Sequence, residues 1–299
     1  MQKVLTKGLM KLIGKNGGGR GPAERRLKSP NGNGAAAPVT APPAFAVGTG
    51  RCGTHFLRDL MEKDPGIAAY HHRSIDSDAF ARYCAWNRLP VDMSPFYDAR
   101  RAWIDEVRSS GLLYFESEPY LSLSIVPLYE RFGARFVFVV RRPEDVVNSL
   151  FVKGWYAEEF YKADADLAPG YAPGLRGNHV FGRIVPNGEE FRRWSRLTRV
   201  GKLAWMWNAL NVRTLEQLRE IPEEQSVTVK LEELGYDCYR RLHAFVGGRQ
   251  SMSEQEFDRI RNSKPGKGRN HRTADVWSER ERREFEAETE EGRRLLGYE

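Results

Sequence analysis

A glycine-rich stretch near the start of the chain has the residue types of an anion-binding loop. Residues 44–58 read AFAVGTGRCGTHFLR. Gly48, Gly50 and Gly53 follow a short apolar run and precede an apolar-periodic segment, which predicts a strand, a loop and a helix. Such a loop directs several backbone N–H groups and the positive end of a helix dipole toward one point. We therefore expect a phosphate-like anion to bind there.

The loop differs from a nucleotide-binding P-loop at two positions that serve ATP chemistry. Gly48 and Gly53 have the P-loop spacing, but Thr54 and His55 stand where Lys and Ser/Thr are required. The loop therefore offers no lysine to a γ-phosphate and no second hydroxyl to magnesium. Its cation comes earlier, at Arg51, whose planar guanidinium can hold a sulfonate or phosphate bidentately. The pattern favours metal-free group transfer over ATP hydrolysis.

A second polar pattern follows the apolar run at residues 136–140. The segment RRPEDVVNSLF starts at Arg141, and Pro143 suits the first turn of a helix on which Ser149 lies two turns later. In isolation, the pattern is typical of a capped helix beside a solvated arginine pair.

Titratable side chains stand at two further places. Glu116 and Glu118 follow an apolar run, and His71 and His72 follow a turn. Adjacent histidines cannot share one helix face, and no other ligand falls at metal-binding spacing, so we expect no metal site. Ligands of open α/β sheets bind at the carboxyl ends of the strands, where Glu116, Arg141 and the glycine loop can converge.

Near-continuous apolar runs predict the strands that must position these residues. The runs cover residues 45–47, 112–115, 136–140 and 227–229 and alternate with helical patterns at 77–86, 98–107, 202–219 and 278–291. Such strands are typical of a parallel sheet that is covered on both faces. We predict a three-layer α/β/α fold with a central parallel sheet and a P-loop-like anion loop.

The N-terminal segment differs from the rest of the chain in charge and composition. Residues 1–34 carry eight lysines and arginines against one glutamate, which accounts for the whole formal charge of +7. The remainder is formally neutral, so we expect no nucleic-acid partner. Residues 1–13 have the pattern of an interfacial amphipathic helix that contacts a membrane weakly, or else form a solvated tail. Residues 14–43 read as a flexible linker.

We predict that residues 44–299 form one domain in which residues 153–201 are a loop-rich lid or acceptor-binding wall.

Three cysteines without CxxC spacing suit a reducing compartment, and Cys52 is interpreted as a small residue that fits the loop. The chain has no apolar run of membrane-spanning length and no evident secretory signal. We expect a cytoplasmic protein, with peripheral membrane contact as an open alternative.

Taken together, these motifs resemble those of sulfotransferases that use 3′-phosphoadenosine 5′-phosphosulfate (PAPS). GTGRCGTHFL resembles their 5′-phosphosulfate loop, and Arg141 with Ser149, eight residues later, resembles their 3′-phosphate motif. YFESEPY, residues 114–120, is similar to the segment that supplies the base in carbohydrate sulfotransferases, and residues 227–248 resemble a later strand and helix. The resemblance covers residues 44–299.

The resemblance implies a donor site and metal-free transfer from PAPS to a hydroxyl of a carbohydrate or other small acceptor. The implied donor-binding residues are Gly48, Thr49, Gly50, Arg51, Cys52, Gly53, Thr54, His55, Arg141, Ser149 and, in the basic segment KPGKGR, Lys267. Arg51 would also stabilise charge on the bridging oxygen, and Glu116 would be the base. Glu118, His71 and His72 remain alternatives for the base.

Two other functions fit parts of the sequence. A nucleotide-dependent phosphotransferase or kinase could use the glycine loop, although the missing Lys-Ser/Thr after Gly53 argues against it. A non-enzymatic binder of membranes or nucleic acid could act through the basic N-terminal tail, although the neutral remainder disfavours it.

Overall fold

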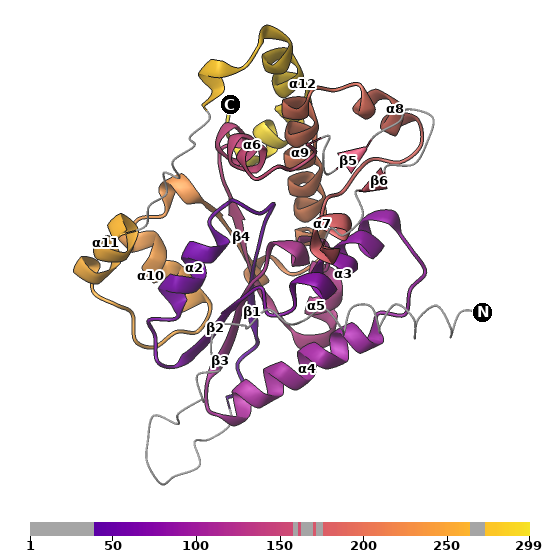
Figure 1. Cartoon of the computed structure of the whole chain (residues 1–299). Coiled ribbons are helices and arrows are strands. Elements are labelled where there is room, and N and C mark those ends of the chain that lie inside the picture. Colours follow the sequence, from indigo (N-terminus) through magenta and orange to yellow (C-terminus); the bar gives the residue numbers. More distant parts are fainter. Residues whose placement is uncertain (1–38, 158–160, 163–169, 172–175, 264–272) are drawn as a thin grey trace.

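A five-stranded parallel sheet lies between two layers of helices in the computed structural model (Figure 1). The model describes residues 39–157, 161–162, 170–171, 176–263 and 273–299. The strands, in their order across the sheet, are β2 (Ile67–His71), β3 (Leu113–Ser117), β1 (Ala44–Val47), β4 (Arg135–Val140) and β7 (Ser226–Lys230). The predicted α/β fold with a central parallel sheet is confirmed.

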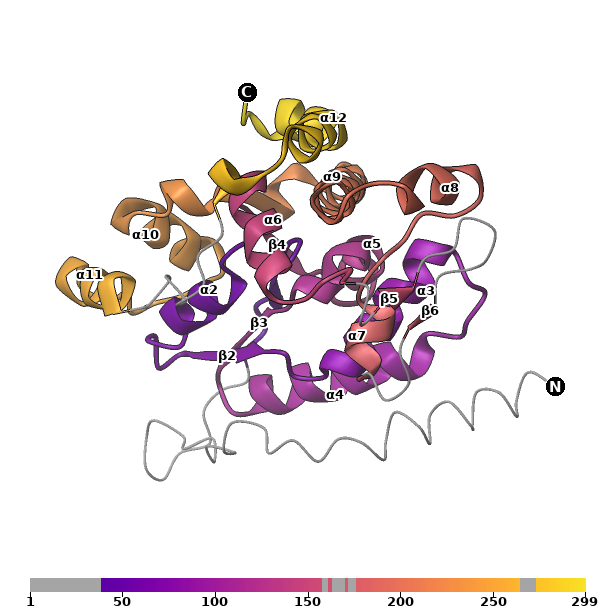
Figure 2. The same cartoon turned by 45° about the horizontal axis from the view of Figure 1, so that its top comes forward.

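Alternate residues of each strand face two separate cores, because successive side chains of a strand point to opposite faces. Ala46 and Val137 pack with α2 (Thr54–Met61), α10 (Tyr236–Phe245) and α11 (Glu254–Ser263). Phe45 and Phe136 pack on the other face. That face is covered by α3 (Ile75–Asn87), α4 (Ser94–Ser109), α5 (Ile125–Phe132), α6 (Pro143–Val152) and α9 (Arg199–Leu218), and α12 (Glu279–Leu296) packs along α9 (Figure 2). Both faces of the sheet are therefore buried.

The four predicted strands are confirmed, but the sequence analysis missed β2. Its sequence, IAAYH, is short and poor in large apolar residues, because β2 is an edge strand paired only with β3. Its last residues, Tyr70 and His71, are half-buried. Trp205, Leu210 and Leu218 of α9 are buried, as expected of core residues.

The segment 153–201 contains short elements that lie beside the main fold. Strands β5 (Tyr161–Lys162) and β6 (Gly170–Tyr171) pair antiparallel, and α7 (Gly177–Phe181) and α8 (Glu189–Ser195) follow. Phe181 of α7 contacts Phe80 of α3, with ring centroids 5.2 Å apart. The remaining short helices are η1 (Pro119–Leu123), η2 (Glu223–Gln225), η3 (Leu231–Glu233) and η4 (Ala274–Val276). The predicted N-terminal helix at 1–13 and Lys267 lie outside the described residues.

Asp64 joins the turn after α2 to the loop after α10, close to the start of β2. Its Oδ2 accepts hydrogen bonds from His243 Nε2 at 2.7 Å and from the backbone N–H groups of Arg249 at 2.9 Å and Gln250 at 3.1 Å. Both side chains of the Asp64–His243 pair are buried. Burial by itself raises the pKa of Asp64, but the hydrogen bonds outweigh it and hold the pKa below its ordinary value.

Asp64→Asn is expected to lower the free energy of unfolding by about 2 kcal/mol near neutral pH, since it weakens several buried hydrogen bonds. The pKa of Asp64 is lower in the folded state than in the unfolded chain. The charged form therefore contributes its stability fully above about pH 4, and this is lost as the pH falls through the folded-state pKa. Urea unfolding at about pH 7 and about pH 3.5 should show the difference from wild type shrinking in acid.

The exposed Asp98→Asn is the matched control for that measurement and should leave stability unchanged. The prediction would be contradicted if Asp64→Asn were as stable as wild type at neutral pH. It would also be contradicted if the loss of unfolding free energy were the same at both pH values.

Candidate active site

Most of the predicted site residues that the structure describes lie at the carboxyl edge of the sheet. β1 leads into the loop at residues 48–53, β2 ends at His71, β3 is followed by Glu118 and β4 is followed by Arg141. In parallel sheets this edge is where ligands bind, since the strand ends and the following helix N-termini face one crevice. The glycine loop and Arg141 therefore lie at one edge of the sheet, as expected, whereas Glu116 lies within β3 and pairs with the buried Arg100.

The glycine loop turns through three residues with positive φ. These are Gly50 at 86°, Arg51 at 58° and Gly53 at 104°. At a φ of 104° a residue with a Cβ is strained, and a Cβ on Gly53 would also lie 2.5 Å from Leu231 Cδ1 of η3, which would have to shift. A Cβ on Gly50 would meet nothing nearer than 3.9 Å, so the space beside Gly50 is open.

The N-terminus of α2 has features that suit an anion. Gly53 supplies no side-chain cap, and the first turn of α2 carries no acidic residue. The first N–H groups of a helix have no partner within the helix, and its dipole is positive at this end. The loop and the start of α2 together form the kind of cradle that binds phosphate and related groups.

The second anion motif lies directly against this loop. Arg51 Nε donates a hydrogen bond to Ser149 Oγ at 2.8 Å, and Arg141 Nη1 donates to the carbonyl oxygen of Arg51 at 3.2 Å. Burial lowers the pKa of Arg51, and the nearby charge of Arg141 lowers it further. Among the described residues Arg141 has one carboxylate partner, Asp145 at 3.3 Å, so the pair keeps excess positive charge. An anion placed here would be attracted by both arginines.

Three residues that the sequence analysis did not assign hold the turn around Arg141. Trp207 Nε1 donates to the carbonyl oxygen of Arg141 at 3.1 Å. Glu232 accepts the backbone N–H of Arg142 at 2.8 Å and the hydroxyl of Tyr298 at 3.1 Å. These contacts come from α9, η3 and the C-terminus, and no local sequence signal pointed to them.

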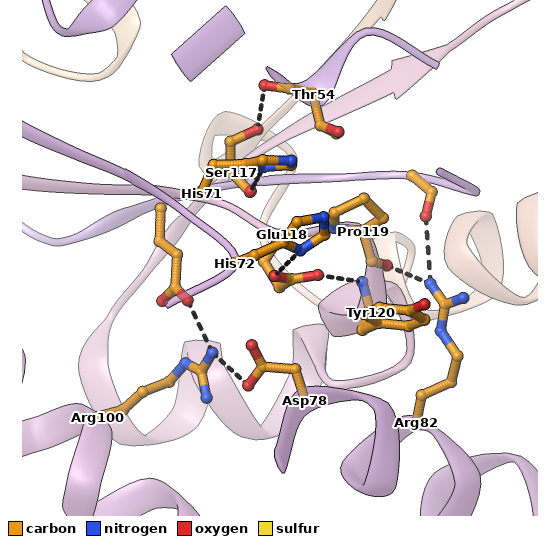
Figure 3. Close-up of polar contacts among 12 residues, drawn as sticks. Thr54, His71, His72, Asp78, Arg82, Arg100, Ser117, Glu118, Pro119 and Tyr120 are labelled. Carbon is orange, nitrogen blue, oxygen red and sulfur yellow. Dashed lines mark hydrogen bonds and ion pairs between the residues drawn. The ribbon is translucent and has the colours of Figure 1, made fainter. Parts of the chain in front are cut away.

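Glu118 and His72 form a pair beside the loop (Figure 3). Glu118 is fully buried, and its Oε1 accepts the backbone N–H of Tyr120 at 3.0 Å. Its Oε2 lies 2.7 Å from His72 Nδ1, while the His72 side chain is 35% exposed. A carboxylate that accepts from Nδ1 leaves Nε2 as the ring nitrogen able to take up a proton. An imidazole held in this way is suited to act as a general base.

The other two histidines of this edge are less suited to that role. His71 Nδ1 lies 2.5 Å from the carbonyl oxygen of Ser117, and burial, with the neighbouring His72, lowers the pKa of His71 to about 4. A base with so low a pKa is weak near neutral pH. The His55 ring stands edge-on to His71, with centroids 5.1 Å apart, and its Nδ1 lies 3.3 Å from Asp59.

Glu116 sits in a buried ion cluster behind the pair. Its Oε1 accepts from Arg100 at 2.9 Å and its Oε2 accepts from the hydroxyl of Tyr114 at 2.8 Å. Arg100 also bonds Asp78 at 2.8 Å, as Figure 3 shows. Burial raises the pKa of Asp78 well above its ordinary value despite Arg100. Both oxygens of Glu116 are thus occupied and its side chain is 0% exposed.

The fold is similar to that of solved sulfotransferase structures. The sulfotransferase STF9 from Mycobacterium avium aligns with a TM-score of 0.52 and 14% identity, over 86% of this chain and 77% of that chain. This chain has a sulfotransferase fold.

Two further sulfotransferase domains align less well. The domain from the curacin biosynthetic pathway has a TM-score of 0.43 and 10% identity, over 70% of this chain and 75% of that chain. The domain from the Synechococcus PCC 7002 olefin synthase has a TM-score of 0.41 and 13% identity, over 82% and 85%. No family model and no curated protein sequence matches the chain.

Within the part of this sulfotransferase fold that the structure describes, no group of three or more His, Cys, Asp or Glu side chains could hold a metal ion. None of the described helices has the length and hydropathy needed to span a membrane.

Cys52 is a packing residue of the loop. Its side chain is buried, and burial raises the pKa of the thiol although several backbone N–H groups oppose the shift. The thiolate is the reactive form, so a buried thiol with a raised pKa is inert. This agrees with the interpretation of Cys52 as a small residue that fits the turn.

Iodoacetamide is therefore expected to leave Cys52 unmodified in the folded protein and to modify it after unfolding. Cys238, which is only half-buried, is the internal comparison and should react faster. Mass spectrometry of peptides after timed labelling would measure both rates. Labelling of Cys52 ahead of Cys238 in the folded protein would contradict the assignment.

Proposed function

We propose that this protein is a sulfotransferase that moves a sulfonate group from PAPS to a hydroxyl of a carbohydrate or another small acceptor without a metal ion. The observation that carries the proposal is the 2.8 Å contact between Arg51 and Ser149. It joins the glycine loop and the Arg141 motif into one site with two anion-binding ends. PAPS carries two anionic groups, a 5′-phosphosulfate and a 3′-phosphate, and ATP lacks the second.

The residues at the two ends fit these groups. The backbone N–H groups of residues 48–55 and the start of α2 would hold the 5′-phosphosulfate, as helix N-termini hold phosphate. Arg141 and Ser149 would hold the 3′-phosphate by charge-assisted hydrogen bonds. Arg51 stands between the two ends, and the open space beside Gly50 leaves room for a ligand. Lys267 remains a predicted contact.

We assign the base to His72 and its orientation to Glu118, in preference to Glu116. Both oxygens of Glu116 are taken by Arg100 and Tyr114, whereas His72 is partly exposed and its Nδ1 is fixed by a buried carboxylate. Glu118 stabilises the charged imidazole as it forms.

PAPS supplies an activated sulfonate with a good leaving group. His72 Nε2 accepts the proton of the acceptor hydroxyl as its oxygen bonds to sulfur, and the bond from sulfur to the bridging oxygen breaks. Arg51 stabilises the negative charge that develops on that oxygen. The products are the sulfated acceptor and 3′-phosphoadenosine 5′-phosphate.

Calorimetry with 3′-phosphoadenosine 5′-phosphate and with ATP, each in magnesium and in chelator, tests the donor assignment. We expect the bisphosphate to bind without magnesium and at least about tenfold more tightly than ATP, since one additional charge-assisted contact contributes about that much. A preference for ATP with magnesium would overturn the proposal and favour a phosphotransferase. Turnover is then measured as release of the bisphosphate from PAPS, with water or an added hydroxyl compound as acceptor.

A further inference from the structure

Arg82 of α3 is a fully buried arginine to which the proposed reaction assigns no role. Its Nη2 donates to the carbonyl oxygen of Pro119 and, at 3.1 Å, to Ser122 Oγ (Figure 3). The same nitrogen lies 3.5 Å from the carbonyl oxygen of Gly48. The guanidinium lies 4.7 Å from the centre of the Tyr120 ring. Arg82 therefore contacts segments from both sides of the candidate site.

The charge of Arg82 is costly to bury. Its Nε and Nη1 have no hydrogen-bond partner in the described part of the chain, whereas the equally buried Arg100 binds two carboxylates. Burial lowers the pKa of Arg82 to about 10, so the side chain stays charged at neutral pH. Burying a charge without an ion-pair partner destabilises the folded protein, and an apolar side chain in the same place would avoid that cost. A cost of this kind beside a candidate active site indicates a functional role.

The contacts of Arg82 begin where the hydrogen bonds of the sheet end. The ladder between β1 and β3 reaches Ala46 and Ser117, and the backbone N–H of Glu118 still donates to the carbonyl oxygen of Ala46 at 2.8 Å. Beyond that point the chain runs into the glycine loop at Gly48 and into η1 after Glu118. Arg82 joins these two segments through the carbonyl oxygens of Gly48 and Pro119.

We propose that Arg82 is a positioning residue that sets the distance between the glycine loop, which holds the donor, and the His72–Glu118 pair, which activates the acceptor. The inference rests on the proposed function. Transfer requires the acceptor oxygen, the sulfur and the bridging oxygen to be aligned, and a displacement of about 1 Å can cost about 100-fold in rate. Binding of the donor alone does not require that alignment.

The test compares Arg82→Met, which removes the charge, with Arg82→Lys, which keeps it. Arg82→Met is expected to lower turnover at saturating PAPS about 100-fold, while the affinity for 3′-phosphoadenosine 5′-phosphate changes less than about fivefold. The turnover of Arg82→Lys should be about tenfold higher than that of Arg82→Met, because an ammonium can still reach a carbonyl oxygen. If Arg82→Met does not fold, Arg82→Lys against wild type gives the same comparison, with an expected loss of about tenfold in turnover alone.

The control is Arg135→Met. Arg135 lies at the amino end of β4, away from the candidate site at the carboxyl ends of the strands. Like Arg82, it donates to a main-chain carbonyl oxygen, that of Phe245 at 2.7 Å. Its turnover should stay within about twofold of wild type, since no contact of the site changes.

A second measurement does not depend on activity. In the free protein, the ¹⁵N ring signals of neutral His72, which are assigned by their absence from His72→Asn, should show a proton on Nδ1 and none on Nε2, because Glu118 accepts from Nδ1. In Arg82→Met we expect the signals of more than one tautomer of the His72 ring. In Arg135→Met we expect the Nδ1-protonated tautomer alone.

Unchanged ring signals in Arg82→Met, turnover within about threefold of wild type, or equal losses of turnover and affinity would each overturn the positioning role. A wild-type protein that neither binds the bisphosphate nor releases it from PAPS would refute the proposed function instead. In that case the ring signals would still decide whether Arg82 holds the His72–Glu118 pair.

Discussion

Replacing His72 with asparagine is expected to lower turnover about 1000-fold, within the usual contribution of a general base, while the affinity for 3′-phosphoadenosine 5′-phosphate stays nearly intact. Asparagine cannot take up the acceptor proton, whereas the proposed donor contacts lie on the glycine loop, at Arg141 and on α6. Rates of bisphosphate release at saturating PAPS would measure the loss of turnover, and calorimetric titration with the bisphosphate would measure the affinity.

The deciding comparison for the base is between two glutamates that lie two positions apart. Glu118→Gln should lower turnover about 100-fold, because the amide orients His72 but no longer carries the charge that stabilises the imidazolium. Glu116→Gln should mainly reduce stability, since it weakens the buried pair with Arg100. Loss of turnover in folded Glu116→Gln with full turnover in His72→Asn would assign the base to Glu116, as the sequence pattern favoured.

Arg141→Ala is expected to weaken binding of 3′-phosphoadenosine 5′-phosphate about 10- to 100-fold, the value of a hydrogen bond to a charged group. Binding of 5′-AMP should barely change, because that nucleotide has no 3′-phosphate for Arg141 to contact. Ser149→Ala should act in the same direction with a smaller loss, of about fivefold, since a hydroxyl carries no charge. Calorimetric titration of each variant with both nucleotides would give the two affinities.

Arg142→Ala is the matched control for Arg141→Ala. Arg142 is the next residue, its side chain is exposed, and the backbone N–H that bonds Glu232 is kept in the variant. Its affinities for both nucleotides should match wild type. If Arg141→Ala weakens both nucleotides equally, Arg141 does not recognise the 3′-phosphate, and that end of the donor site must be reassigned.

Strands and loops with strong local signals were predictable from the sequence. The runs that became β1, β3, β4 and β7 are nearly continuous in apolar residues, because a strand buried on both faces cannot alternate with polar ones. The glycine loop was predictable because positive φ at Gly50 and Gly53 requires residues without a Cβ clash. β2 was missed because an edge strand needs few large apolar residues and IAAYH has a weak signal.

Which residues of the site act together was decided by the tertiary structure. The sequence placed Glu116 and Glu118 at one strand end, and only α4 and the unpredicted β2 distinguish them, since Arg100 occupies the first and His72 pairs with the second. Arg51 and Ser149 are 98 positions apart, and their contact depends on β1 and β4 lying side by side. By itself, the sequence determined the residue types and the strand–loop–helix units, because these follow from local backbone preference and periodicity. Burial and ion pairing depend on side chains that come from distant elements, so the tertiary structure alone decided which carboxylate is held in an ion cluster and which pairs with a histidine.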